Sequence, residues 1–143
     1  METLKTVISW LLRIILAGVL IYAGCAKIAR PDEFFADISN YRVFPVWTAY
    51  AAAYFMPPFE IVVGIFLLTR RGLDAGLIAS AAMMAVFIIL ISSAWARGLD
   101  ISCGCFGNGG TGQYFETIVR DLALILCAAA IHVLNKPHKK SYE

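Results

Sequence analysis

Two cysteines separated by one glycine are the residues of this sequence best suited to chemistry. Cys103-Gly104-Cys105 lies in a glycine-rich segment between two apolar stretches and is followed by Phe106 and Gly107. Two thiols at this spacing can form a disulfide, bind a soft metal ion or belong to an ordinary turn. A Cys-Gly-Cys disulfide closes a very small ring, and strained disulfides exchange readily with other thiols. The pair therefore favours redox chemistry, with a structural disulfide or a turn as the alternatives.

Metal binding is the weaker interpretation of this pair, because a zinc site needs four ligands. Cys25 is the only further thiol expected near the pair, and Cys127 is expected to be an inert core residue. Copper(I) accepts two thiolates and stays open as an alternative. A nearby cation would stabilise the reactive thiolate, and Lys27, Arg97 and Arg120 are expected near the same surface.

The composition of the 143-residue chain is that of a membrane protein. Apolar residues make up 60% of the chain and charged residues 15%, compared with about 45–50% and about 25% in typical globular proteins. The mean hydropathy is +0.74. A net charge of +2 is too small to indicate a nucleic-acid partner. We therefore expect a lipid bilayer as the environment and no nucleic acid as a partner.

Four apolar segments are each long enough to cross a bilayer, which takes about 20 helical residues. They predict membrane helices over residues 7–26, 47–69, 73–96 and 117–134. The first segment also resembles a secretory signal peptide, but we expect it to be retained. The sequence thus predicts a single membrane domain over residues 1–143, an all-α bundle of four transmembrane helices.

The loop after the first span contains a short amphipathic pattern. Pro31 is well placed to open a helix, and Phe34 and Tyr41 belong to a set of apolar residues at helical spacing. Asp37 is expected to face away from these apolar residues. The pattern predicts a short interfacial helix that covers one end of the bundle.

Basic residues divide unequally between the two ends of such a bundle. The end with both termini carries six of them, which are Lys5, Arg70, Arg71, Lys136, Lys139 and Lys140. The opposite end carries four, which are Lys27, Arg30, Arg42 and Arg97. The positive-inside rule then predicts that both termini are cytoplasmic and that the Cys-Gly-Cys loop lies outside. In a bacterial inner membrane that side is the periplasm, where disulfides persist.

Two charged residues, Arg13 and Glu60, are expected deep in the bilayer. Charges in lipid are costly and are functional candidates by default. From their distances to the cytoplasmic helix ends, an interior Arg13–Glu60 pair is plausible. The favoured interpretation is a structural ion pair, and a proton or quinone site is the alternative.

Several short motifs together resemble the MauE/DoxX family of redox-associated membrane proteins, and the MauE branch in particular. The matching motifs are Gly24-x-x-Lys27, Pro57-x-x-Glu60, Gly98 ahead of Cys103-Gly104-Cys105-Phe106-Gly107, and Arg120-Asp121. They extend from the first span to the last, and the Cys-Gly-Cys-Phe-Gly string is the most specific of them.

The resemblance implies a four-helix bundle that helps to mature a disulfide-rich periplasmic client, as in methylamine dehydrogenase biogenesis. A thioredoxin-like protein would be its partner, and Cys103 and Cys105 would carry thiol–disulfide exchange. Lys27, Glu60, Arg120 and Asp121 match family positions without an assigned role. Cys25 lies outside the family pattern.

The leading hypothesis is therefore a thiol–disulfide oxidoreductase-like membrane protein, with a quinone as its candidate cofactor. One alternative is a non-catalytic assembly factor whose Cys-Gly-Cys disulfide is structural. Another is a quinone- or lipid-binding bundle in which the cysteines are incidental.

Overall fold

The computed structural model describes residues 2–43, 45–69, 71–99 and 113–135. The described chain folds into five helices, and it contains no strand. In chain order they are α1 (Glu2–Ala29), α2 (Pro31–Asn40), α3 (Val46–Leu68), α4 (Leu73–Ala96) and α5 (Gln113–Asn135). Four of them contain stretches long and apolar enough to cross a membrane, which are Thr3–Ala29, Val46–Leu68, Leu73–Ala96 and Phe115–Asn135. The prediction of an all-α, multi-pass membrane protein is confirmed.

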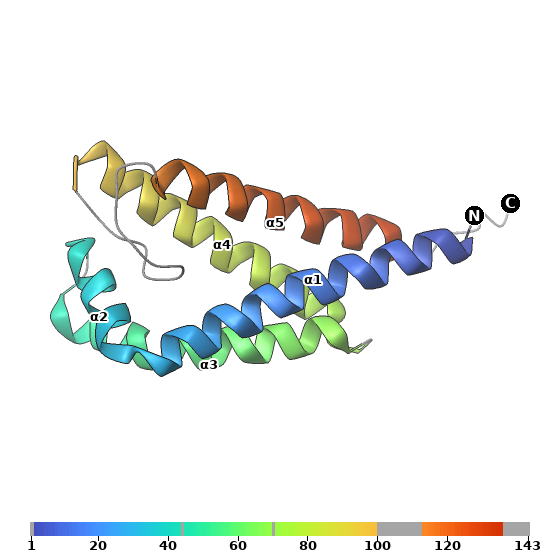
Figure 1. Cartoon of the computed structure of the whole chain (residues 1–143), viewed down its shortest axis with the longest axis horizontal. Helices are drawn as coiled ribbons and strands as arrows, with labels where there is room; N and C mark the ends of the chain where they lie inside the picture. Colours follow the sequence, from blue (N-terminus) through green and yellow to red (C-terminus); the bar gives the residue numbers. More distant parts are fainter. Residues whose placement is uncertain (1, 44, 70, 100–112, 136–143) are drawn as a thin grey trace, which may run out of the picture.

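The four long helices form two antiparallel pairs. Helix α1 packs along α3, and α4 packs along α5 (Figure 1). The two pairs touch through α1 with α5 and α3 with α4. They lie close together at the end that holds the N-terminus and separate toward the end covered by α2 (Figure 1).

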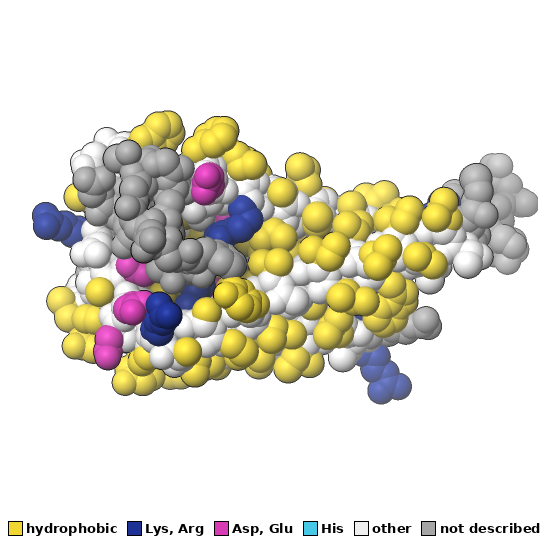
Figure 2. Space-filling model, viewed as in Figure 1, with side chains coloured by type: hydrophobic (Ala, Val, Ile, Leu, Met, Phe, Trp, Pro, Cys, Tyr) yellow, Lys and Arg dark blue, Asp and Glu magenta, His cyan; other side chains and the backbone are white. Residues whose placement is uncertain are grey.

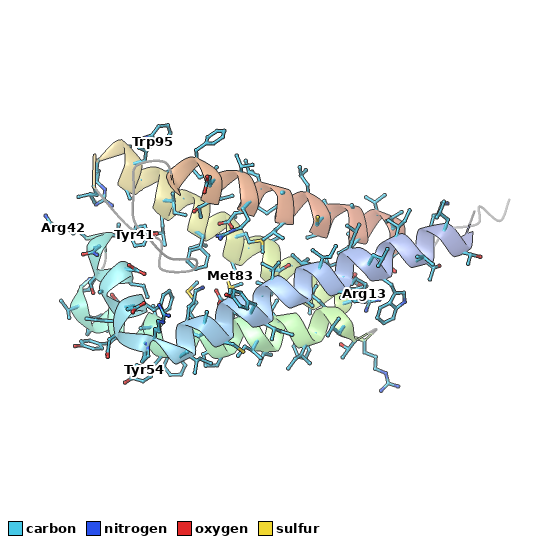
Figure 3. The ribbon with its side chains drawn as sticks, in the orientation of Figure 1. Arg13, Tyr41, Arg42, Tyr54, Met83 and Trp95 are labelled. Carbon is cyan, nitrogen blue, oxygen red and sulfur yellow. The ribbon has the colours of Figure 1, made fainter. Side chains whose placement is uncertain are left out.

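The outer surface of the helices is apolar, as a lipid-facing surface must be. Large hydrophobic side chains such as Phe55, Ile78 and Leu126 are more than two-thirds exposed. They cover the middle of the molecule, and charged side chains gather toward its ends (Figure 2). Tyr54 and Trp95 point outward near the α2 end (Figure 3), where aromatic residues typically meet the membrane interface.

Helices α1 and α3 approach closely because glycines face the partner helix. A Cβ atom added at Gly24 would lie 2.8 Å from the carbonyl oxygen of Pro57, and one added at Gly64 would lie 3.1 Å from that of Ala17. Real Cβ atoms essentially never lie within 3.0 Å of another atom, so an added Cβ at Gly24 would force a shift, and the contact at Gly64 would be tighter than nine in ten real ones. Small residues allow the same close packing in other membrane helix pairs.

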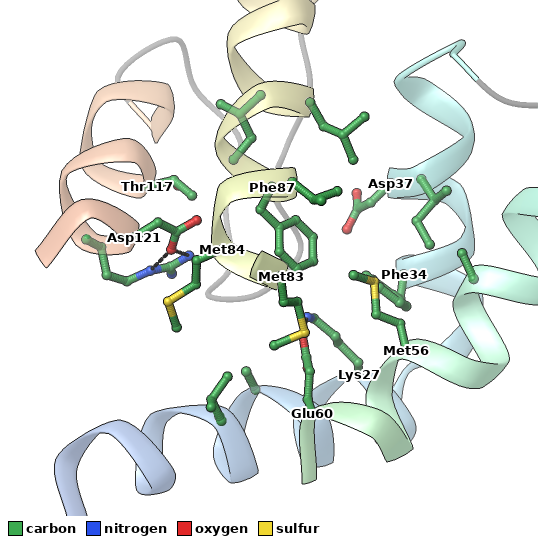
Figure 4. A pocket seen from close by; sticks show the side chains of 18 of the residues that line it. Lys27, Phe34, Asp37, Met56, Glu60, Met83, Met84, Phe87, Thr117 and Asp121 are labelled. Carbon is green, nitrogen blue, oxygen red and sulfur yellow. Dashed lines mark hydrogen bonds and ion pairs between the residues drawn. The ribbon is translucent and has the colours of Figure 1, made fainter. Parts of the chain in front are cut away.

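Helix α2 lies across the end of the bundle, as the amphipathic pattern predicts. Pro31 is its first residue, and the side chains of Phe34 and Tyr41 are buried. Arg97, at the end of α4, donates a hydrogen bond of 2.7 Å to the carbonyl oxygen of Tyr41. The expectation for Asp37 was wrong, because its side chain points inward between the helix pairs (Figure 4).

A candidate ligand cavity between the helix pairs

A cavity of about 230 Å³ lies between the two helix pairs, next to α2. All five helices contribute to its wall, and most of the side chains are apolar (Figure 4). Charged side chains also line it, which are Lys27, Asp37, Glu60, Arg120 and Asp121. An apolar pocket with a few polar groups at fixed positions is the usual form of a small-molecule site.

Lys27 and Glu60 form an ion pair in this wall. Lys27 lies in the last turn of α1, where a cation is favourable at the helix C-terminus. Its Nζ donates a hydrogen bond to Oε1 of Glu60, which lies in the middle of α3. Both side chains are almost completely buried, with 3% and 2% exposed. The Lys27 ammonium also lies 4.9 Å from the ring centres of Phe34 and Phe87, which adds cation–π attraction.

The second carboxylate oxygen of Glu60, Oε2, does not take part in this ion pair. Oε2 is buried and has no hydrogen-bond partner among the described residues. An unpaired buried acceptor costs free energy, so native proteins seldom keep one without a reason. Glu60 is one of the residues that line the cavity, which makes its Oε2 the candidate acceptor for a molecule inside.

A second ion pair faces the cavity from α5. Arg120 donates hydrogen bonds of 3.1 and 3.2 Å, through Nη2 and Nε, to Oδ1 of Asp121. The Asp121 side chain is 6% exposed and that of Arg120 is 36% exposed. The two ion pairs thus lie on different walls, with Met83, Met84 and Phe87 of α4 between them (Figure 4).

The predicted Arg13–Glu60 pair does not form, and the helix register explains why. Gly64 of α3 lies against Ala17 of α1, so Arg13, one turn earlier, lies level with the end of α3 and far from Glu60. The Arg13 guanidinium donates hydrogen bonds to the carbonyl oxygens of Leu67 (2.9 Å) and Thr69 (3.2 Å). Arg13 therefore caps the C-terminal end of α3. It lies toward the end of the bundle that holds the N-terminus, which is the end predicted to face the cytoplasm (Figure 3).

Cys103 and Cys105 lie outside the described residues, so the predicted redox pair stays a prediction. Helix α4 ends at Ala96, and Gly98 has a φ of +65°, a conformation that suits glycine at a helix end. Helix α5 then begins at Gln113. Both helix ends lie at the α2 end of the bundle (Figure 1).

The predicted accessory residues fall into two groups. Lys27, Glu60, Arg120 and Asp121 all line the cavity. Arg97 instead links the end of α4 to the end of α2. Cys25 is a free, exposed thiol on α1 and Cys127 is a free, half-buried thiol on α5, so Cys127 is less deeply buried than expected. The described part of the chain holds no group of three or more metal-binding side chains.

Sequence reasoning missed the cavity as a whole. Asp37 was assigned to the opposite face of α2, and Phe87 was not singled out at all. One available signal was methionine placement, because Met56, Met83 and Met84 all line the cavity and the chain has four methionines in total. Flexible methionine side chains are common at surfaces that adapt to a ligand.

Comparison with known proteins agrees with the motifs. The family profile described as "Methylamine utilisation protein MauE" matches residues 5–134. The methylamine utilization protein MauE of Paracoccus denitrificans is 30% identical over 130 residues, which are 90% of this chain and 70% of that protein. The protein of the same name from Methylorubrum extorquens is 37% identical over 106 residues, or 73% of this chain and 57% of its own length. No solved structure matches.

Proposed function

Since this chain belongs to the MauE family, we propose that it is a membrane accessory protein that matures disulfide-containing proteins by thiol–disulfide exchange. The relatives are named for methylamine utilisation, and we assign this chain to the same process. One observation carries the proposal, which is the Cys103-Gly104-Cys105 string between the fourth and fifth helices of a membrane bundle. The pair would exchange disulfides with a thioredoxin-like protein.

The side of the membrane is part of the proposal. The sequence places different numbers of basic residues at the bundle's two ends, and Lys27 does not count toward the outer end because it is buried in an ion pair. This increases the basic excess at the end with both termini, which the positive-inside rule assigns to the cytoplasm. The Cys-Gly-Cys segment would then lie in the periplasm, where disulfides persist.

The proposed exchange balances without a further reactant. A thiolate of the reduced pair attacks the partner's disulfide, forms a mixed disulfide and releases one partner thiolate. The other thiolate of the pair attacks the mixed disulfide, so that Cys103 and Cys105 become a disulfide and the partner leaves as a dithiol. Two electrons pass to the partner, and its two thiolates take up the two protons that the pair has lost. The reverse sequence oxidises the partner.

Trapping of the mixed disulfide tests this proposal. Cys105→Ser removes the resolving thiol if Cys103 makes the first attack, and Cys103→Ser does so in the opposite case. Membranes are quenched with acid, alkylated and separated on non-reducing gels, with Cys25→Ser and Cys127→Ser as matched controls. We expect a reducible adduct in one of the two loop variants and none in the controls.

Client maturation is measured in the same cells. If both loop variants mature disulfide-containing clients at the normal rate, the exchange proposal is wrong. If the pair is required but stays a disulfide under all conditions, a non-catalytic assembly role with a structural disulfide replaces it.

A further inference from the structure

The Lys27–Glu60 pair in the cavity wall has hydrogen-bond donors and an acceptor that no other described residue satisfies. The Lys27 ammonium has three N–H donors and a single hydrogen-bond acceptor, Oε1 of Glu60, among the described residues. Oε2 of the same glutamate is a buried acceptor that has no partner there. A donor and an acceptor are thus left over side by side in a wall that is mostly apolar. We propose that this cavity binds the ring of a lipid-soluble quinone.

The charge of the wall argues for a neutral ligand. The described lining has two basic residues, Lys27 and Arg120, and three acidic residues, Asp37, Glu60 and Asp121. Its formal charge is therefore 2 − 3 = −1, which disfavours fatty-acid carboxylates and phospholipid phosphates. Polar metabolites are disfavoured as well, because most of the wall is apolar and the cavity lies among membrane helices.

The chemistry of the leftover groups selects a quinone among neutral lipids. A quinone carbonyl accepts a hydrogen bond, which Lys27 Nζ can donate. The hydroxyl of the corresponding quinol donates one, which Oε2 of Glu60 can accept. One buried ion pair can therefore serve both redox forms of the ligand, whereas an aliphatic neutral lipid would leave these groups unused.

The placement of the polar side chains agrees with a ring that is polar at both ends. The Lys27–Glu60 pair and the Arg120–Asp121 pair lie on different walls, and the Phe87 ring lies between them (Figure 4). A quinone ring has carbonyl groups on opposite edges and an apolar face that an aromatic side chain can cover. This inference concerns binding alone, and it does not require that Cys103 and Cys105 exchange disulfides.

The test is direct binding to the purified full chain in nanodiscs, with decylubiquinone as the probe. Quinone that stays with the protein after gel filtration is extracted and quantified, and empty nanodiscs give the lipid background. The chain also carries Cys103→Ser and Cys105→Ser, so failure of the exchange proposal cannot affect the result. We expect saturable binding of one quinone per chain.

Two adjacent alanines of α3 provide a matched pair of variants. Ala52 lines the cavity and Ala51 is exposed outside it. Ala52→Phe should fill the cavity and weaken decylubiquinone binding at least tenfold, whereas Ala51→Phe should leave binding unchanged. Equal binding by both variants would overturn the proposal.

Replacement of the ion pair tests the polar contacts. The double variant Lys27→Met/Glu60→Met keeps the site filled and apolar, which folded proteins often tolerate. Loss of charge-assisted hydrogen bonds should weaken decylubiquinone binding by about tenfold or more. Unchanged binding by the folded double variant, or equally strong displacement of decylubiquinone by oleic acid, would show an unspecific lipid space and refute the quinone site.

Discussion

The Lys27–Glu60 pair should dominate the stability of the α2 end of the bundle. Lys27→Met leaves a carboxylate at a position that is 2% exposed. Loss of one partner of a buried ion pair costs about 3–5 kcal/mol, because the remaining charge is desolvated without compensation. Glu60→Met should cost less, since the Lys27 ammonium keeps two aromatic rings at 4.9 Å. The double variant Lys27→Met/Glu60→Met should lose the least stability of the three, because it leaves no unpaired buried charge.

The free energy of unfolding is measured by titration of the micelle-bound protein with denaturing detergent, followed by circular dichroism. The matched control is Arg30→Met, because Arg30 forms a 3.4 Å ion pair with Glu33 in which both side chains are mostly exposed. Surface pairs of this kind contribute about 0–1 kcal/mol. If Lys27→Met costs no more than Arg30→Met, or if the double variant is the least stable, the assignment of a buried and mutually compensating pair is wrong.

Three further predictions concern packing, capping and orientation. Gly24→Ala should destabilise the bundle by about 1–3 kcal/mol, because its Cβ would lie 2.8 Å from a backbone oxygen of α3. Gly18→Ala, with no atom within 4 Å of the added Cβ, should be neutral in the same unfolding assay, and equal losses would refute the glycine contact. Arg13→Met should lower the free energy of unfolding by at least about 1.5 kcal/mol, because charged hydrogen bonds to two carbonyls at the end of α3 are lost. Arg13→Lys should restore the stability only partly, because lysine lacks the guanidinium fork. Full restoration by lysine would argue against the cap. Cys103 should react with a membrane-impermeant maleimide in intact reduced cells, and labelling only after the membrane is opened would contradict the proposed orientation.

The helices themselves could be predicted well, because length and hydropathy decide which segments cross a bilayer. The first span nevertheless runs further than residues 7–26, from Thr3 to Ala29. Its extra turn at the end includes Lys27, which the charge count had assigned to the outer surface. A long lysine side chain can follow the helix back toward Glu60, so a charge near a predicted span end can still be buried.

The pairing of charges could not be predicted, because lipid-facing and core-facing residues are both apolar. Helices α3 and α4 have large apolar side chains on their exposed face and mostly apolar ones on their buried face, so hydrophobic periodicity does not identify the packed face. The glycine contacts at Gly24 and Gly64 fix the register of α1 against α3. That register moves Arg13 to the end of α3 and brings Lys27 to Glu60.

The redox state of Cys103 and Cys105 in intact cells tests the central claim most directly. Cells are exposed briefly to diamide, returned to fresh medium and quenched at intervals, and the free thiols of the chain are counted from the mass added by an alkylating reagent. Exchange with a partner predicts that the pair is oxidised by diamide and returns to its starting mixture within minutes. The exchange proposal would be contradicted by a pair that stays wholly oxidised or wholly reduced throughout. It would also be contradicted by a pair that recovers within minutes although no adduct with another protein forms.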